Sequence, residues 1–139
     1  MRQEGTVLQI KTHAQGLVEV TGPVQGWLRE TGIQAGLLTV FCRHTSASLT
    51  IQENADPDVV LDLNAFFAAL VPQGPDRYRH SDEGPDDMPA HIKSALTDVS
   101  LSIPVVQGRA VLGTWQGIYL FEHRTASHTR EVVLQVIGD

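Results

Sequence analysis

Hydrophobic and polar residues alternate at the start of the chain in the manner of β-strands. Residues 6–12 carry apolar side chains at every second position, with Leu8 and Ile10 on one face and polar side chains between them. The alternation resumes at residues 17–20, after the break that Gly16 introduces. The pattern therefore predicts that these two segments pair as a hairpin.

Two longer segments change to helical spacing, and each carries an apolar stripe. The first opens at Thr21, a residue that can cap a helix, and stops at Gly32, a frequent helix terminator. The second has Asp56 as its predicted N-cap and Pro57 at its first helical position, and Pro72 follows its end. The sequence thus predicts two helices with well-marked ends.

Residues 72–90 form the one long polar stretch of the chain. A loop of this length in a compact domain is either mobile or functional, and Tyr78 together with a histidine among acids favours function. The loop leads into a third predicted helix over residues 88–96, with Asp87 as its expected cap. Asp87 and His91 are four residues apart, so they lie on the same side of that helix.

The remaining apolar runs are short and predict strands. Residues 36–42 show little alternation, so we expect a strand that is buried on both faces and that delivers His44 to its end. Further strands are expected at residues 46–51, 101–105, 110–112, 118–124 and 131–137. About eight strands and three short helices imply an α+β fold with two sheet layers, in a single domain over residues 1–139.

Composition removes several classes of function. The chain has 139 residues, 42% of them hydrophobic, and a net charge of −6. The negative charge argues against binding of nucleic acid, although a local cluster of Lys and Arg could still hold a small anion. Cys42 is the only cysteine, which excludes an intrachain disulfide. There is no apolar run long enough for a membrane span and no signal peptide, so a cytoplasmic protein is expected.

Three histidines are the best candidates for chemistry. His44 lies at a strand end, His80 in the long loop and His91 on the third helix. Three protein ligands and an open position are the pattern of a catalytic zinc. The alternative is that each imidazole is solvated or satisfied in the core, because the sequence contains no compact metal-ligand motif.

Acidic, cationic and hydroxyl groups accompany these histidines. Acids near them could orient the imidazoles or act as general acid or base, although Asp87 is also explained as a helix cap. The cations and hydroxyls could hold a phosphate. Trp115, between Gly113 and Gly117, is either buried at a bulge or an aromatic wall for a planar ring.

Several motifs in register resemble the YjbQ family, small bacterial and archaeal proteins described as secondary thiamine-phosphate synthases. They are His44-Thr45-Ser46-Ala47-Ser48-Leu49-Thr50, Glu53-Asn54-Ala55-Asp56-Pro57, Asp86-Asp87-Met88-Pro89-Ala90-His91-Ile92-Lys93 and Gly113-Thr114-Trp115-Gln116-Gly117-Ile118, followed by Glu122-His123-Arg124. The resemblance covers nearly the whole chain and implies a β-sandwich-like core and a homotrimer with clefts near the subunit boundaries.

The resemblance also implies roles for individual residues. It makes His44, His80 and His91 the metal ligands, with Glu53, Lys93, Glu122 and Arg124 as catalytic groups and Ser46, Ser48, Trp115 and Gln116 as binding groups for a small phosphorylated metabolite. The metal expected with three histidines is zinc, while a diphosphate substrate would favour magnesium. The implied activity is thiamine-phosphate-synthase-like transfer. A zinc-dependent phosphoester hydrolase and a non-catalytic trimeric binding module are the alternatives.

Overall fold

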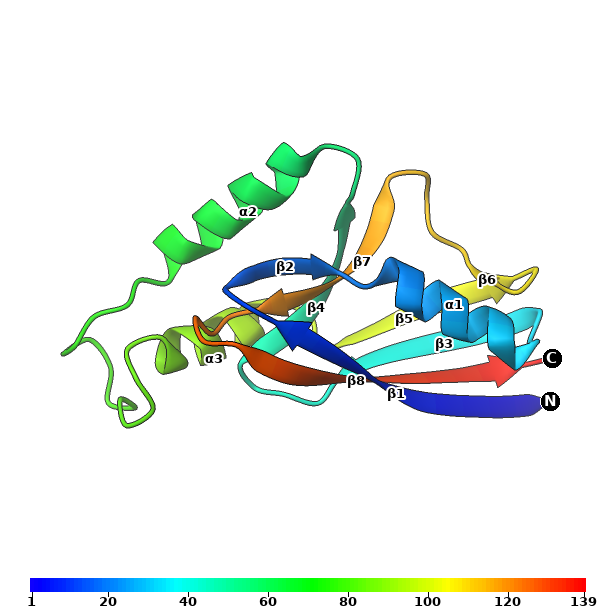
Figure 1. Ribbon diagram of the computed structural model, residues 1–139, viewed down its shortest axis with the longest axis horizontal. Coiled ribbons are helices and arrows are strands. Elements are labelled where there is room, and N and C mark those ends of the chain that lie inside the picture. Colours follow the sequence, from blue (N-terminus) through cyan, green and yellow to red (C-terminus); the bar gives the residue numbers. More distant parts are fainter.

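The computed structural model describes residues 1–139 and contains two antiparallel sheets and three helices (Figure 1). The larger sheet has the strand order β1-β8-β3-β5-β6 and the smaller one β2-β7-β4. The elements are β1 (Arg2–Thr12), β2 (Gly16–Glu19), α1 (Thr21–Thr31), β3 (Ala35–Cys42), β4 (Ala47–Glu53), α2 (Pro57–Leu70), α3 (Asp87–Leu96), β5 (Ser100–Val106), β6 (Arg109–Ala110), β7 (Gln116–Glu122) and β8 (His128–Gly138). The predicted α+β fold with two sheet layers and short helices is confirmed.

The predicted hairpin at the start of the chain is wrong. β1 pairs with β8, so that Leu8 faces Val132, and β2 pairs with β7 in the other sheet. Alternation identifies a strand but does not identify its partner. Gly16 marks the change of sheet with a φ of +133°, and a Cβ atom there would collide with the side chain of Asn64. Glycine is therefore favoured at the point where the chain leaves the first sheet.

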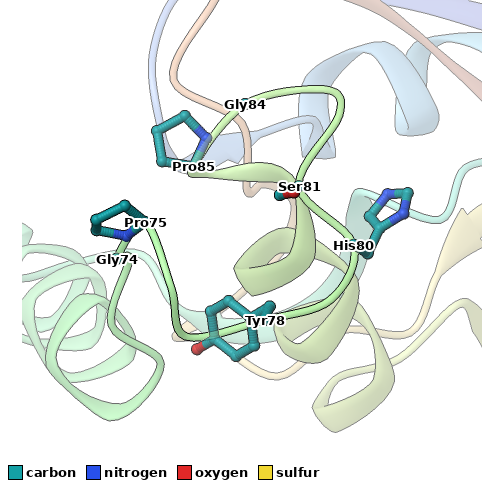
Figure 2. A pocket seen from close by; sticks show the side chains of 7 residues that line it. All are labelled: Gly74, Pro75, Tyr78, His80, Ser81, Gly84 and Pro85. Carbon is teal, nitrogen blue, oxygen red and sulfur yellow. The ribbon is translucent and has the colours of Figure 1, made fainter.

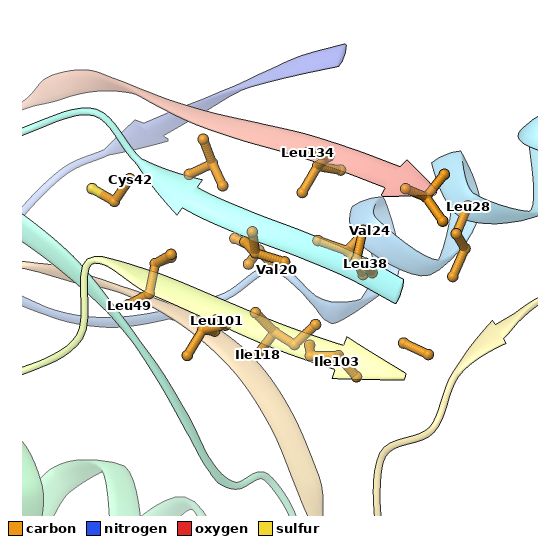
Figure 3. Packing of buried hydrophobic residues seen from close by; sticks show 14 of the residues in the cluster. Val20, Val24, Leu28, Leu38, Cys42, Leu49, Leu101, Ile103, Ile118 and Leu134 are labelled. Carbon is orange, nitrogen blue, oxygen red and sulfur yellow. The ribbon is translucent and has the colours of Figure 1, made fainter. Parts of the chain in front are cut away.

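A single cluster of buried side chains joins both sheets and α1. The larger sheet contributes Leu38 and Leu134, the smaller sheet Leu49, and α1 contributes Val24 and Leu28, all fully buried (Figure 3). Cys42 is also fully buried in this cluster, and its thiol donates a hydrogen bond to the carbonyl oxygen of Ala47 at 3.5 Å. Burial raises the pKa of this thiol, as expected for an unreactive cysteine.

β3 is buried on one face only, in contrast to the prediction. Leu38 and Val40 are buried, but Leu37 and Phe41 are 48% and 42% exposed. The apolar residues of β3 therefore lie on both faces of the strand, but no other part of the chain covers the outer face. Exposed apolar side chains on neighbouring strands extend this outer face: Val7, Val106 and Ile137.

The helix ends follow the sequence in two cases out of four. Gly32 adopts the left-handed conformation at the end of α1, and the Asp56 carboxylate accepts a hydrogen bond from the Asp58 N–H at the start of α2. Neither Thr21 nor Asp87 acts as a cap. The Thr21 hydroxyl instead accepts a hydrogen bond from the N–H of Ile118, which fastens α1 to β7.

The second helix contributes nothing to the core. α2 has no buried residue, and Figure 1 shows it standing apart from the sheets. Its contact with the body includes a hydrogen bond from the Leu17 N–H to Asn64 Oδ1 and an edge-to-face contact between Phe67 and Phe121. No helix of the protein combines the length and apolar character that crossing a membrane requires.

Candidate metal centre

His80, Asp87 and His91 form a compact group of metal-ligand atoms. One ligand atom from each lies within 4.8 Å of the others. Nε2 of His80 lies 2.6 Å from Oδ2 of Asp87, and Nε2 of His91 lies 3.3 Å from the same oxygen. α3 supplies two members one turn apart, and the loop before it supplies the third. The long polar loop is thus part of the candidate site, as its composition indicated.

The orientation of His91 suits a ligand. Its Nδ1 atom lies 3.0 Å from the carbonyl oxygen of Thr45. Because a carbonyl oxygen can only accept, Nδ1 carries the proton and the lone pair is left on Nε2, which faces Asp87. A backbone partner on the second ring nitrogen is the usual arrangement around a metal-binding imidazole.

Asp87 is held by Arg124. Nη1 of Arg124 donates to Oδ1 of Asp87 at 2.9 Å, its Nε donates to Oδ2 of Asp86 at 2.9 Å, and its Nη2 donates to the carbonyl of Glu83. Burial alone would raise the pKa of Asp87, but the hydrogen bond from His80 and the charge of Arg124 outweigh it and keep that pKa below its usual value. Arg124 is therefore committed to supporting the ligand group and is not free to bind phosphate.

The structure does not bring His44 into this group. Its Nε2 atom accepts a hydrogen bond from the N–H of Glu131 at 2.7 Å, and burial lowers its pKa. His44 and His91 line the same small cavity of about 270 Å³ but do not converge on one point. Two histidines and Asp87 are thus brought together in place of the predicted three histidines. The spacing of four residues between Asp87 and His91 was the sequence signal for this change.

Glu122 is buried and fully engaged. Its carboxylate accepts hydrogen bonds from Arg130 Nε and Thr12 Oγ1, both at 2.7 Å, and from the N–H of Arg124 at 3.0 Å. Burial opposes ionisation, but these donors lower the pKa of Glu122 below its usual value. An ionised carboxylate with every oxygen occupied supports structure and is not poised as a general base. Nothing in the sequence marks its partner Arg130.

Ser48 belongs to a buried polar chain. Its Oγ lies 2.9 Å from Nε2 of His123 and 2.6 Å from Oγ1 of Thr97. The sequence gives no signal that links Ser48 to His123 or to Thr97. The Ser46 carbonyl accepts a hydrogen bond from Arg130, which places this serine at the same end of β4.

The other predicted binding residues lie at the opposite end of the small sheet. Glu53 pairs with Gln116 in the register of β4 and β7, whereas Ala47 at the other end pairs with Glu122. Seven residues of strand separate these ends by about 20 Å. Trp115 is 62% exposed beside Gln116, so it is not buried at a bulge. Within one chain, these residues and the histidine group do not share a cleft.

A hollow lies beside the ligand group. The loop between α2 and α3 encloses about 330 Å³, with Pro75 and Pro85 on one side, His80 on the other and Tyr78 between (Figure 2). The Tyr78 hydroxyl donates to the carbonyl of Pro72, which fixes the ring. His80 therefore belongs both to the ligand group and to a space large enough for a small metabolite.

The donor set fits a divalent transition metal. Two imidazoles and one carboxylate make three protein ligands, the number that leaves a catalytic zinc with an open position. Asp87 accepts a hydrogen bond from Arg124, and His91 is hydrogen-bonded to the carbonyl oxygen of Thr45. Two of the three ligands are therefore oriented by neighbours. His80, Asp87 and His91 would hold the ion.

Comparisons with known proteins agree on one family. The family described as UPF0047 protein YjbQ-like matches residues 6–139. The chain is 56% identical over 138 residues to UPF0047 protein sll1880 of Synechocystis, covering 99% of this chain and 94% of that one. It is 41% identical to YjbQ of Escherichia coli O157:H7, covering 95% and 96%.

Solved structures show the same fold. A YjbQ/UPF0047 family protein from Clostridium acetobutylicum superposes with a TM-score of 0.86 at 37% identity, over 95% of this chain and 99% of that one. A hypothetical protein from Aeropyrum pernix superposes with a TM-score of 0.89 at 32% identity, over 98% and 99%. The names of these relatives state no activity. On the family match and these identities, the chain belongs to the UPF0047 YjbQ-like family.

Proposed function

We propose that the protein is a zinc-dependent enzyme that acts on a small phosphorylated metabolite at the His80–Asp87–His91 group. The observation that carries this proposal is the convergence of three ligand atoms within 4.8 Å, supported from behind by Arg124 and Thr45. Zinc bound there would supply Lewis acidity toward a phosphoryl oxygen or a water molecule. The hollow beside His80 would receive the substrate.

Two reactions fit this proposal. Thiamine-phosphate-synthase-like transfer joins a pyrimidine to a thiazole phosphate with loss of diphosphate, and it draws on the family resemblance. Hydrolysis of a small phosphoester draws on the donor set, because imidazoles favour zinc whereas diphosphate chemistry usually uses magnesium held by carboxylates. The third alternative is a binding module that holds the metal or metabolite without turnover.

Metal content tests the site first. We expect about one zinc per chain in the purified protein by elemental analysis, and loss of that zinc in His91→Ala and Asp87→Asn. His13→Ala removes an exposed histidine elsewhere and serves as the matched control. His44→Ala should keep its zinc, since His44 lies outside the group. Equal metal content in all four variants would reject the centre.

Turnover tests the reaction. The wild-type protein is assayed with a panel of phosphoesters and with the pyrimidine diphosphate and thiazole phosphate pair, with zinc and with magnesium. Activity that disappears in Asp87→Asn supports an enzyme at this centre, and the substrate that turns over selects between transfer and hydrolysis. Metal binding without turnover on any substrate selects the binding module.

We also propose that the chain assembles as a homotrimer through the outer face of the larger sheet. Five large apolar side chains are between 42% and 55% exposed on this face: Val7, Leu37, Phe41, Val106 and Ile137. An apolar surface of this kind on a sheet is typical of an interface. Light scattering of the purified protein should give three times the chain mass, and Phe41→Lys should give a smaller species. A monomeric wild type would contradict this assembly.

A further inference from the structure

A second cavity lies under α2, on the side of α3 that faces away from the ligand group. It encloses about 270 Å³ between α2 and the adjoining ends of β2 and β7. Lys93 lines it, two residues after His91, and positions two apart on a helix point to different sides. The cavity is therefore distinct from the candidate metal centre.

Lys93 has no partner in the chain. Its side chain is almost fully buried, at 4% exposure, yet its ammonium makes no hydrogen bond and no ion pair. The opposite charge that acts on it is that of Asp86, which is already paired with Arg124. The ammonium keeps some contact with solvent in the cavity, since it is not among the fully buried polar atoms without a partner. A cation held in such a space, without a partner in the chain, suits a ligand of opposite charge.

His123 is the second unpartnered group on this cavity. Its Nδ1 atom is the one buried side-chain polar atom of the protein without a hydrogen-bond partner. Thr97 has one hydroxyl proton, and the carbonyl oxygen of Lys93, 2.9 Å from Thr97 Oγ1, can only accept it, so the Ser48 hydroxyl donates to Thr97. His123 then donates its Nε2 proton to Ser48 Oγ, and Nδ1 is left as an acceptor that lacks a donor.

Asn64 adds a second donor. Its Oδ1 accepts a hydrogen bond from the N–H of Leu17 at 3.2 Å, and this backbone donor fixes which side of the amide is oxygen. The Nδ2 group has no partner within the chain. Asn64 reaches the cavity from α2, opposite Lys93 on α3.

The cavity offers donors but no free acceptor among its charged groups. Glu122 also lines it and carries a negative charge, but its oxygens are taken by Arg130, Thr12 and a backbone N–H. Phe67 and Phe121, in edge-to-face contact at 5.2 Å between ring centroids, form an apolar wall. Donors at one end and aromatic rings beside them suit a small ring that bears an oxyanion.

We propose that this cavity binds a small aromatic or heterocyclic oxyanion that keeps one acidic proton, with its anionic oxygen on Lys93, its hydroxyl on Nδ1 of His123 and its ring against Phe67 and Phe121. The proposal does not depend on the metal centre. Binding of this kind gives Lys93, Asn64 and Nδ1 of His123 a hydrogen-bond partner at once, which a purely apolar ligand cannot do.

The experiment uses phenyl phosphate, inorganic phosphate and the neutral benzyl alcohol as probes, with calorimetry on the full protein. Phenyl phosphate should bind saturably and more tightly than phosphate, and benzyl alcohol should not bind. Lys93→Met keeps the length of the side chain and should weaken the binding of phenyl phosphate at least tenfold. Arg77→Met, which changes an exposed cation that has no ion pair, is the control.

His91→Ala separates this site from the metal centre. It should lose metal and still bind phenyl phosphate, whereas loss of both would assign the anion to the metal and overturn the second site. A direct readout on the wild type guards against a variant that fails to fold. In NMR titrations the His123 ring signals should shift saturably with phenyl phosphate, and unshifted signals would overturn the proposal.

Discussion

The Arg124 guanidinium lies 2.9 Å from Oδ1 of Asp87, a residue 37 positions earlier, and the pair is nearly withdrawn from solvent. We expect Arg124→Ala to lower the free energy of unfolding by ~3–5 kcal/mol, because two buried carboxylates lose their cation. Zinc affinity should fall about 10–100-fold. Urea unfolding and calorimetry measure both effects. Arg77→Ala is the control, and equal behaviour of the two variants would contradict the supporting role.

The contact between His91 and Thr45 makes a spectroscopic prediction. In the zinc-loaded protein, nitrogen NMR of the histidine rings should show a protonated Nδ1 and a metal-shifted Nε2 for His91. The cause is the carbonyl oxygen of Thr45, which can only accept the Nδ1 proton. A His91 ring protonated on Nε2 in that sample would rule out its role as an Nε2 ligand.

His123 should make the protein sensitive to mild acid. Burial lowers the pKa of His123 from 6.5 to about 3. Below pH 6.5 the unfolded chain takes up a proton that the folded chain refuses, so stability is full above pH 6.5 and falls as the pH drops toward 3. The slope from this one group is about 1.4 kcal/mol per pH unit.

Urea unfolding at fixed protein concentration between pH 6.5 and pH 5 measures that slope. His123→Gln cannot take up the proton. The pH dependence of its stability should therefore be smaller than that of the wild type by about 1.4 kcal/mol per pH unit. Parallel curves for the two proteins would mean that His123 titrates equally in both states.

Two leucines contrast a core position with an outer one. Leu38 is fully buried, whereas Leu61 on α2 is 62% exposed. Leu38→Ala should cost ~2–5 kcal/mol in urea unfolding, because it leaves a cavity between the sheets. Leu61→Ala should change stability by no more than about 0.5 kcal/mol. A large loss at Leu61 would show that another surface covers α2.

Two glycines give opposite expectations for the same change. Gly16→Ala should destabilise by ~1–3 kcal/mol, because φ is +133° and Asn64 occupies the space for the Cβ atom. Gly22→Ala in α1 meets no atom within 4 Å and should stabilise by ~0.5–1 kcal/mol. Thermal unfolding of both variants checks the signs, and equal signs would show that backbone conformation does not govern the effect.

The fold class followed from periodicity, but strand pairing did not. Alternation around Leu8 and the apolar run ending at Cys42 located strands correctly, because side-chain direction has a period of two in any sheet. The partner of β1 is β8, at the far end of the chain, and no local pattern encodes that distance. The exposed outer face of β3 could not be predicted for a related reason. An apolar residue predicts burial, but the sequence does not show whether the same chain provides the covering surface.

The candidate site was predicted in part. The sequence identifies His80 and His91 as candidate ligands, and the spacing of Asp87 and His91 places those two side chains on one side of a helix. His44 was included because it ends a strand, but its lone pair is used by Glu131. His123 cannot be singled out from the sequence, because only the folded chain shows that Nδ1 lacks a partner while Nε2 is hydrogen-bonded to Ser48.

Cys42 turns the protein into its own reporter. The chain has a single thiol, which is fully buried at the end of β3. A reagent that modifies thiols can reach it only when the packing around that strand opens. The rate of modification therefore reports how often this part of the protein unfolds locally, without an added label. Each variant discussed above can thus be ranked by colorimetric labelling on micrograms of material, before a single unfolding curve is recorded.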